Sequence, residues 1–118
     1  MKTFEEIPLY QKAKELCLEV YRINNDQYKK DFGFKDQIQR AAISVMNNIA
    51  EGFERGSDKD FIKFLYYSKG SVGEIRSLLN VAVELGYIEF QLYDKLKNDC
   101  LDISKQLSNF IKYLSIKS

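Results

Sequence analysis

The feature that most constrains this chain is a helical periodicity that continues over long stretches with few interruptions. The 118 residues contain a single proline, Pro8, and six glycines that fall mostly between the periodic runs. Apolar residues recur at spacings of three and four, which places them on one face of a helix. The pattern predicts four helices, over residues 8–23, 35–54, 57–85 and from about 89 onward.

Four amphipathic helices of this length predict an all-α fold, and short connections make consecutive helices neighbours in space. We therefore expect an antiparallel up-and-down four-helix bundle, with residues 1–118 forming a single domain. Ser57 is expected to cap the third helix with Asp60 three residues on, and Gly86 to end it. Residues 27–34 fit either a short helix capped by Asp26 or a loop.

Charge and cysteine usage narrow the class of protein. Cys17 and Cys100 lie inside apolar runs without a CxxC spacing, so both are expected to be buried thiols. The net charge is +1, and no segment forms the basic tail or arm typical of strong nucleic-acid binders. No signal peptide opens the chain and no stretch approaches the ~20 apolar residues of a membrane span, so we expect a cytoplasmic protein without a membrane partner.

Residues that carry catalysis are scarce. The chain has no histidine, the commonest general base and metal ligand. It contains no glycine-rich phosphate loop, no nucleophile elbow and no Glu-x-x-His pair of the di-iron bundles. Lone carboxylates such as Glu15, Glu19 and Glu84 are typical of solvated helix faces. We expect no enzyme activity, no cofactor and no metal.

A stripe of short polar side chains distinguishes the second predicted helix. One face of this helix carries Arg40, Ser44, Asn47 and Glu51, with Asn48 beside them and Gly52 at the end of the stripe. The third predicted helix carries a facing set of residues: Ser68, Gly70, Ser71 and Glu74. Three interpretations remain open: an ordinary solvent face, a packing or assembly surface, and a direct ligand site. A simple hairpin would bring Arg40 level with Glu74, so an ion pair between the two helices is expected.

The start of the third predicted helix is apolar almost all the way round. Residues 61–67 include Phe61, Ile62, Tyr66 and Tyr67, and one four-helix core cannot cover every side. This pattern predicts a homo-oligomer that uses these four residues as contacts. The alternative is a monomer in which the tyrosine hydroxyls reach water.

Residues 37–52 read QIQRAAISVMNNIAEG, with Arg40 and Ser44 upstream of the 48–52 core. This run resembles the signature of the 23S rRNA intervening-sequence proteins, a family of small bacterial four-helix-bundle proteins. Gly70-Ser71 followed by Glu74 is similar to the second motif of the family. Residues 10–13 resemble the family's opening of the first helix, so the resemblance spans nearly the whole chain.

The resemblance implies an antiparallel four-helix bundle that assembles as a ring of five. Related retroelement accessory proteins are basic pentamers that bind nucleic acid, so the resemblance also implies binding of RNA or DNA. This chain departs from those relatives in being nearly neutral, and Glu89 stands where a capping Ser or Thr would precede the fourth helix.

Three cations near the turn into the third helix are the candidates for nucleic-acid contact: Arg55, Lys59 and Lys63. Asp58 and Asp60 lie among them, so the same cations also fit an ordinary solvated surface. The sequence thus favours a non-catalytic, self-assembling bundle with a role in binding RNA or DNA. The alternative is a structural or protein-binding scaffold without nucleic-acid binding.

Overall fold

The computed structural model describes residues 2–117, and their regular structure is entirely helical. In this described part of the chain, a short 3-10 turn precedes five α-helices: η1 (Phe4–Glu6), α1 (Pro8–Tyr21), α2 (Asp26–Lys30), α3 (Phe32–Glu54), α4 (Asp58–Glu84) and α5 (Phe90–Lys117). The predicted all-α class is confirmed. Within this described part of the chain, no helix is long and apolar enough to cross a membrane.

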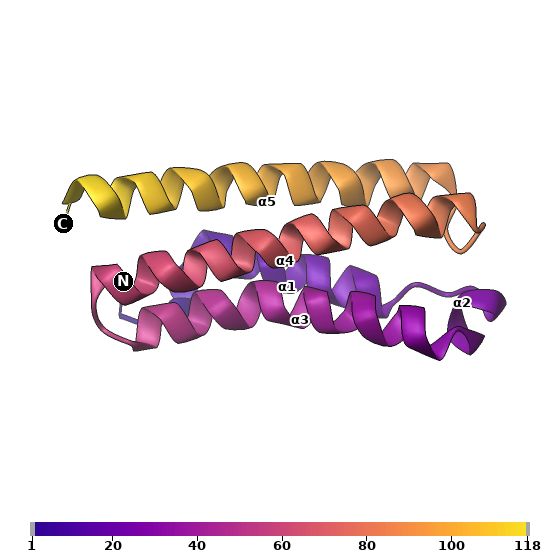
Figure 1. The fold of residues 1–118 in the computed structure, drawn as a ribbon, viewed down its shortest axis with the longest axis horizontal. Coiled ribbons are helices and arrows are strands. Elements are labelled where there is room, and N and C mark those ends of the chain that lie inside the picture. The colour runs from indigo at the N-terminus through magenta and orange to yellow at the C-terminus, as the bar shows by residue number, and fades with distance from the viewer. Residues whose placement is uncertain (1, 118) are drawn as a thin grey trace.

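The long helices α1, α3, α4 and α5 lie side by side in a rod of 47 × 20 × 20 Å (Figure 1). α3 packs against α4, α4 against α5, and α1 against both α3 and α5. The turn between α3 and α4 lies at the end of the rod where α5 finishes, and the turn between α4 and α5 lies at the opposite end (Figure 1). α1 and α5 share the least extensive of these contacts.

Local sequence explains where the long helices begin and end. Pro8 occupies the first turn of α1, where its missing N–H leaves no hydrogen bond unmade. The Ser57 hydroxyl accepts a hydrogen bond from the Asp60 N–H at 3.2 Å, which confirms the predicted cap of α4. Gly86 follows α4 with a φ of +77°, and the Tyr87 N–H then reaches the Ala82 carbonyl at 2.9 Å. This arrangement ends a helix and favours glycine at the left-handed position.

The segment that the sequence leaves ambiguous is helical. The Asn25 side chain, rather than Asp26, caps α2 by accepting from the Tyr28 N–H at 2.9 Å. α3 begins at Phe32, three residues before the predicted start, because the Asp31 carboxylate accepts from the Phe34 N–H at 3.2 Å. The same carboxylate accepts from the Tyr87 hydroxyl at 2.6 Å, so a distant turn helps to fix this boundary.

The core contains the apolar stripes of all four long helices. Its fully buried side chains include Leu16 of α1, Ile49 of α3 and Leu107 of α5. Cys17 and Cys100 are buried free thiols, as predicted. Burial raises the pKa of the Cys100 thiol to about 12, so this thiol stays protonated at neutral pH.

Candidate functional site

Gly52 marks the point of close approach between α3 and α4. A β-carbon added at Gly52 would lie 2.8 Å from Cβ of Phe64 and 3.0 Å from Cδ1 of Phe61. Neither distance leaves room for a methyl group, so the contact between the two helices requires a glycine here. The end of the predicted polar stripe is therefore a packing position.

The middle of the stripe is a hydrogen-bonded contact between the helices. The Ser71 hydroxyl donates to Oγ of Ser44 at 2.8 Å. The Asn48 amide donates to the same Oγ at 2.9 Å and to the Ser44 carbonyl at 2.8 Å. Deeper in, the fully buried Ser68 hydroxyl donates to the Val45 carbonyl at 2.7 Å. These short side chains satisfy one another and hold α3 against α4.

The outer members of the stripe face solvent, and the expected pair of Arg40 with Glu74 is wrong. Arg40 is paired instead with Asp36 one turn earlier, at 2.8 Å, and its side chain is 79% exposed. Glu74 accepts a long hydrogen bond from the Gln37 amide at 3.4 Å. Asn47 and Glu51 are also exposed. In a single copy this half of the stripe is a solvent face.

The four predicted oligomer contacts differ in how far the bundle covers them: one is buried, one is half-buried and two are exposed. Phe61 lies in the core, with its ring 5.1 Å from Phe110 and 6.1 Å from Phe53, and Ile62 is half-buried. Tyr66 and Tyr67 remain 57% and 50% exposed. The bundle covers more of this apolar segment than the sequence indicates, which leaves the two tyrosines available to a partner.

Two glycines inside α4 have no packing role within the chain. A β-carbon added at Gly70 or Gly73 would meet nothing within 4 Å, and both positions are exposed. Glycine in a helix interior costs about 1 kcal/mol relative to alanine. Gly70 belongs to the second family motif, whereas no motif singles out Gly73. The two glycines follow Tyr66 by four and seven residues in α4, so all three share one outward face.

The three predicted nucleic-acid contacts lie around the turn between α3 and α4, and all are exposed. Arg55 is only partly free, because it pairs with Glu51 at 3.4 Å and lies 4.9 Å from the ring centre of Phe64. The ammonium of Lys63 lies 5.9 Å from the ring centre of Tyr67. Asp58 pairs with Lys117 of α5 at 3.5 Å, so a lysine outside these three cations offsets the charge of one of their acidic neighbours.

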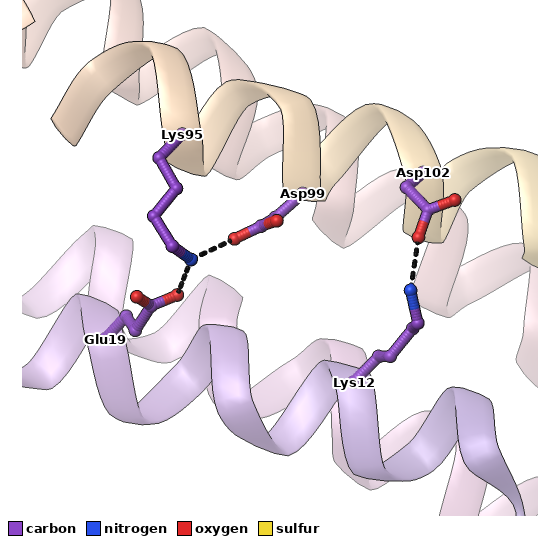
Figure 2. Close-up of polar contacts among 5 residues, drawn as sticks. All are labelled: Lys12, Glu19, Lys95, Asp99 and Asp102. Carbon is purple, nitrogen blue, oxygen red and sulfur yellow. Dashed lines mark hydrogen bonds and ion pairs between the residues drawn. The ribbon is translucent and has the colours of Figure 1, made fainter. Parts of the chain in front are cut away.

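A charged cleft that the sequence analysis missed runs between α1 and α5, with a volume of about 880 Å³. Figure 2 shows two ion pairs across it: Lys12 with Asp102 at 2.6 Å, and Lys95 with Glu19 at 2.8 Å. Lys95 also pairs with Asp99 at 2.8 Å. Charges of opposite sign on the two helices are visible in the sequence, but which of them meet depends on helix packing.

The pKa values of Asp31 and Tyr87 are shifted because their side chains share a hydrogen bond. The Tyr87 hydroxyl lowers the pKa of the Asp31 carboxyl, and the carboxylate raises the pKa of Tyr87. Both pKa values move away from neutrality, which does not prepare either group for proton transfer at pH 7. Between residues 2 and 117, no group of three or more His, Cys, Asp or Glu side chains could hold a metal ion. The polar contacts on the α3–α4 face hold the two helices together.

The comparisons with known proteins agree with the motifs on this face. A family model described as 23S rRNA-intervening sequence protein matches residues 5–109, which is most of the chain. The chain belongs to this family. The resemblance carried by residues 37–52 is thereby confirmed, and the intervening-sequence motif has a structural meaning at Ser44, Asn48 and Gly52.

This intervening-sequence family protein is also similar to a solved structure from Bacteroides thetaiotaomicron VPI-5482. That crystal structure is described as a protein of unknown function from the S23 ribosomal protein family. The two sequences are 27% identical, and the match covers 88% of this chain and 98% of the other, with a TM-score of 0.78. No curated protein sequence matches the chain.

Proposed function

We propose that this family member is an antiparallel up-and-down four-helix bundle that assembles with copies of itself and catalyses no reaction. The observation that carries the proposal is the outward face of α4. Tyr66 and Tyr67 are exposed there, and Gly70 and Gly73 have no neighbour within 4 Å of an added β-carbon. Exposed aromatic rings are enriched at protein interfaces, and glycines allow another backbone to approach closely. A second copy would give both features a role.

The number of copies comes from the family resemblance, which implies a ring of five. Native mass spectrometry at micromolar concentration tests it directly, and the expected spectrum is dominated by a species of five chains. Dilution and sedimentation velocity provide an independent check. A monomer at micromolar concentration would contradict the proposal that the chain self-assembles.

A second candidate function is binding of RNA or DNA at Arg55, Lys59 and Lys63. Their shared position at one end of the rod favours it, because a ring would repeat the three cations once per copy around one rim. If these cations bind no nucleic acid, a structural or protein-binding scaffold is the better account. The free thiols of Cys17 and Cys100 suit the reducing cytoplasm, where we propose that the assembly works.

A further inference from the structure

We infer that neighbouring copies pack the outward face of α3 in one chain against the outward face of α4 in the next. The inference rests on the proposed self-assembly and adds the surfaces and the residue register. The partner is a second copy of this chain, held by complementary shape and charge.

Both helices carry a second row of residues on the side away from the core. We call these rows the α3 seam and the α4 seam. In each row, successive members are alternately four and three residues apart, which is the spacing of helices that pack along their length. The α3 seam consists of Asp36, Arg40, Ile43, Asn47, Ala50 and Glu54, and the α4 seam of Lys59, Lys63, Tyr66, Gly70, Gly73 and Ser77.

Both seams are open in a single copy. All members are exposed except Ala50, which is half-buried. Ile43 is 37% exposed at the middle of the α3 seam, where a large aliphatic side chain has no partner helix.

The register between copies follows from the contacts within one chain. The hydrogen bond from Ser68 to the Val45 carbonyl fixes which residues of α3 and α4 lie at the same height along the rod. Counting outward in opposite directions from this pair places Ile43 level with Gly70, and Glu54 level with Lys59. A rotation about an axis parallel to the rod preserves height, so the same residues are level between neighbours in a ring.

At this register the two seams complement each other in shape. Ile43 of one copy lies opposite Gly70 of the next, and Arg40, the longest side chain of the α3 seam, lies opposite Gly73. The largest side chain of the α4 seam, Tyr66, lies opposite the short Asn47. Each bulky residue therefore meets a position with a small side chain or none, which is how side chains of one helix fit between those of another.

The charges also match. Lys59 lies level with Glu54 of the neighbouring copy, and Lys63 lies level with the turn that carries Glu51. Arg40 comes next to Glu74 of the neighbour. The expected pairing of Arg40 with Glu74, which fails within one chain, is thus available between chains.

The positions of the seams on the bundle agree with a closed ring. α3 and α4 contact each other, so they occupy adjacent corners of the bundle, and their outward faces point about 90° apart. A contact between two different surfaces closes into a ring of four when those surfaces lie about 90° apart and into a ring of five when they lie about 108° apart, so the seams suit a small closed ring and the number five rests on the family resemblance. The groove between the helices, with Ser44 and Ser71, would then face the ring axis.

The test places a long cation into the α4 seam. Gly70→Arg introduces a bulky charge opposite Ile43, and within one chain the position is open, so folding is not hindered. The matched control is Asn109→Arg, which makes a cation at an exposed position of α5. We expect Gly70→Arg to yield monomers with unchanged helical circular dichroism, and Asn109→Arg to assemble as the parent does. Assembly that survives Gly70→Arg would overturn the seam and leave self-assembly standing, whereas a monomeric parent protein would overturn both.

Cysteine cross-linking tests the register itself. The double variant Ile43→Cys/Gly70→Cys should form covalent multimers on mild oxidation, seen as a ladder under denaturing, non-reducing conditions. The double variant Ile43→Cys/Asn109→Cys should give none, and the native thiols are buried. If the assembled first variant gives no ladder, the register is wrong.

Discussion

Glycine normally weakens a helix, and the effect of replacing it depends on what surrounds the missing side chain. We predict that Gly52→Ala lowers the free energy of unfolding by about 1–3 kcal/mol, because the new methyl group overlaps Cβ of Phe64 and forces α3 away from α4. Gly33→Ala is the matched control, since an added β-carbon there meets nothing within 4 Å. It should leave stability unchanged or raise it slightly. Urea denaturation of both variants measures their free energies of unfolding. Equal changes in the two variants would show that Gly52 has no special role in the contact between α3 and α4.

Arg40 shows why sequence reasoning succeeds with some residues and fails with others. The hairpin geometry predicts the height of Arg40 along the rod correctly, since Gln37, one turn before it, reaches Glu74. Height does not determine which way a side chain points around the helix axis. Arg40 points outward, where an acidic residue on its own helix is nearer than one on the next helix. Gly52 lies on the inner edge of the stripe, where Phe61 and Phe64 of α4 leave no room for a side chain.

The helices themselves were predictable where local sequence decides them. The repeats of apolar residues in α1, α3, α4 and α5, the Ser57 cap and the Gly86 stop all act within a few residues of one another. The start of α3 was not predictable to the residue, because Asp31 is held in place by Tyr87 from a distant turn. The cleft between α1 and α5 was missed for the same reason, since its ion pairs join residues far apart in the chain.

The ion pairs between α1 and α5 give a prediction about pH. The hydrogen bond from Lys12 lowers the pKa of Asp102, and the Gln106 amide contributes further. Because the folded-state pKa lies below the ordinary value, this contact stabilises the fold at neutral pH. The stabilisation is lost as the pH falls through the lowered pKa. Lys12→Met should therefore raise the pKa of Asp102 toward its ordinary value, as measured by carboxyl NMR titration.

The control for this titration is Lys14→Met, because Lys14 lines the same cleft but is not paired with Asp102. We expect it to leave the pKa of Asp102 close to that of the parent protein. A pKa of Asp102 that does not move in Lys12→Met would show that the contact across the α1–α5 cleft is not maintained in solution.

For the whole molecule, assembly and nucleic-acid binding make competing demands on the same cations. In the inferred contact between copies, Lys59 and Lys63 face carboxylates of the neighbouring chain. Arg55 already pairs with Glu51 in its own chain. A ring closed through the two seams would therefore have a less positive rim than a ring in which the lysines of every copy are unpaired. If nucleic acid binds nevertheless, the cations must be shared between phosphates and carboxylates, which makes the binding modest.

Gel-shift titrations with structured RNA and with duplex DNA test the second candidate function at low and at physiological salt. We predict modest, sequence-tolerant binding that weakens steeply with salt, because each phosphate contact releases counterions. Replacing Arg55, Lys59 and Lys63 with glutamine should abolish the binding, while Lys105→Gln/Lys112→Gln on the exposed side of α5 should preserve it. Native mass spectrometry of each variant separates loss of binding from loss of assembly, and Arg55→Gln alone tests the rim without changing either seam. Absence of binding at low salt would favour the scaffold alternative, whereas binding that the triple replacement leaves unchanged would show that these three cations are not the nucleic-acid contacts.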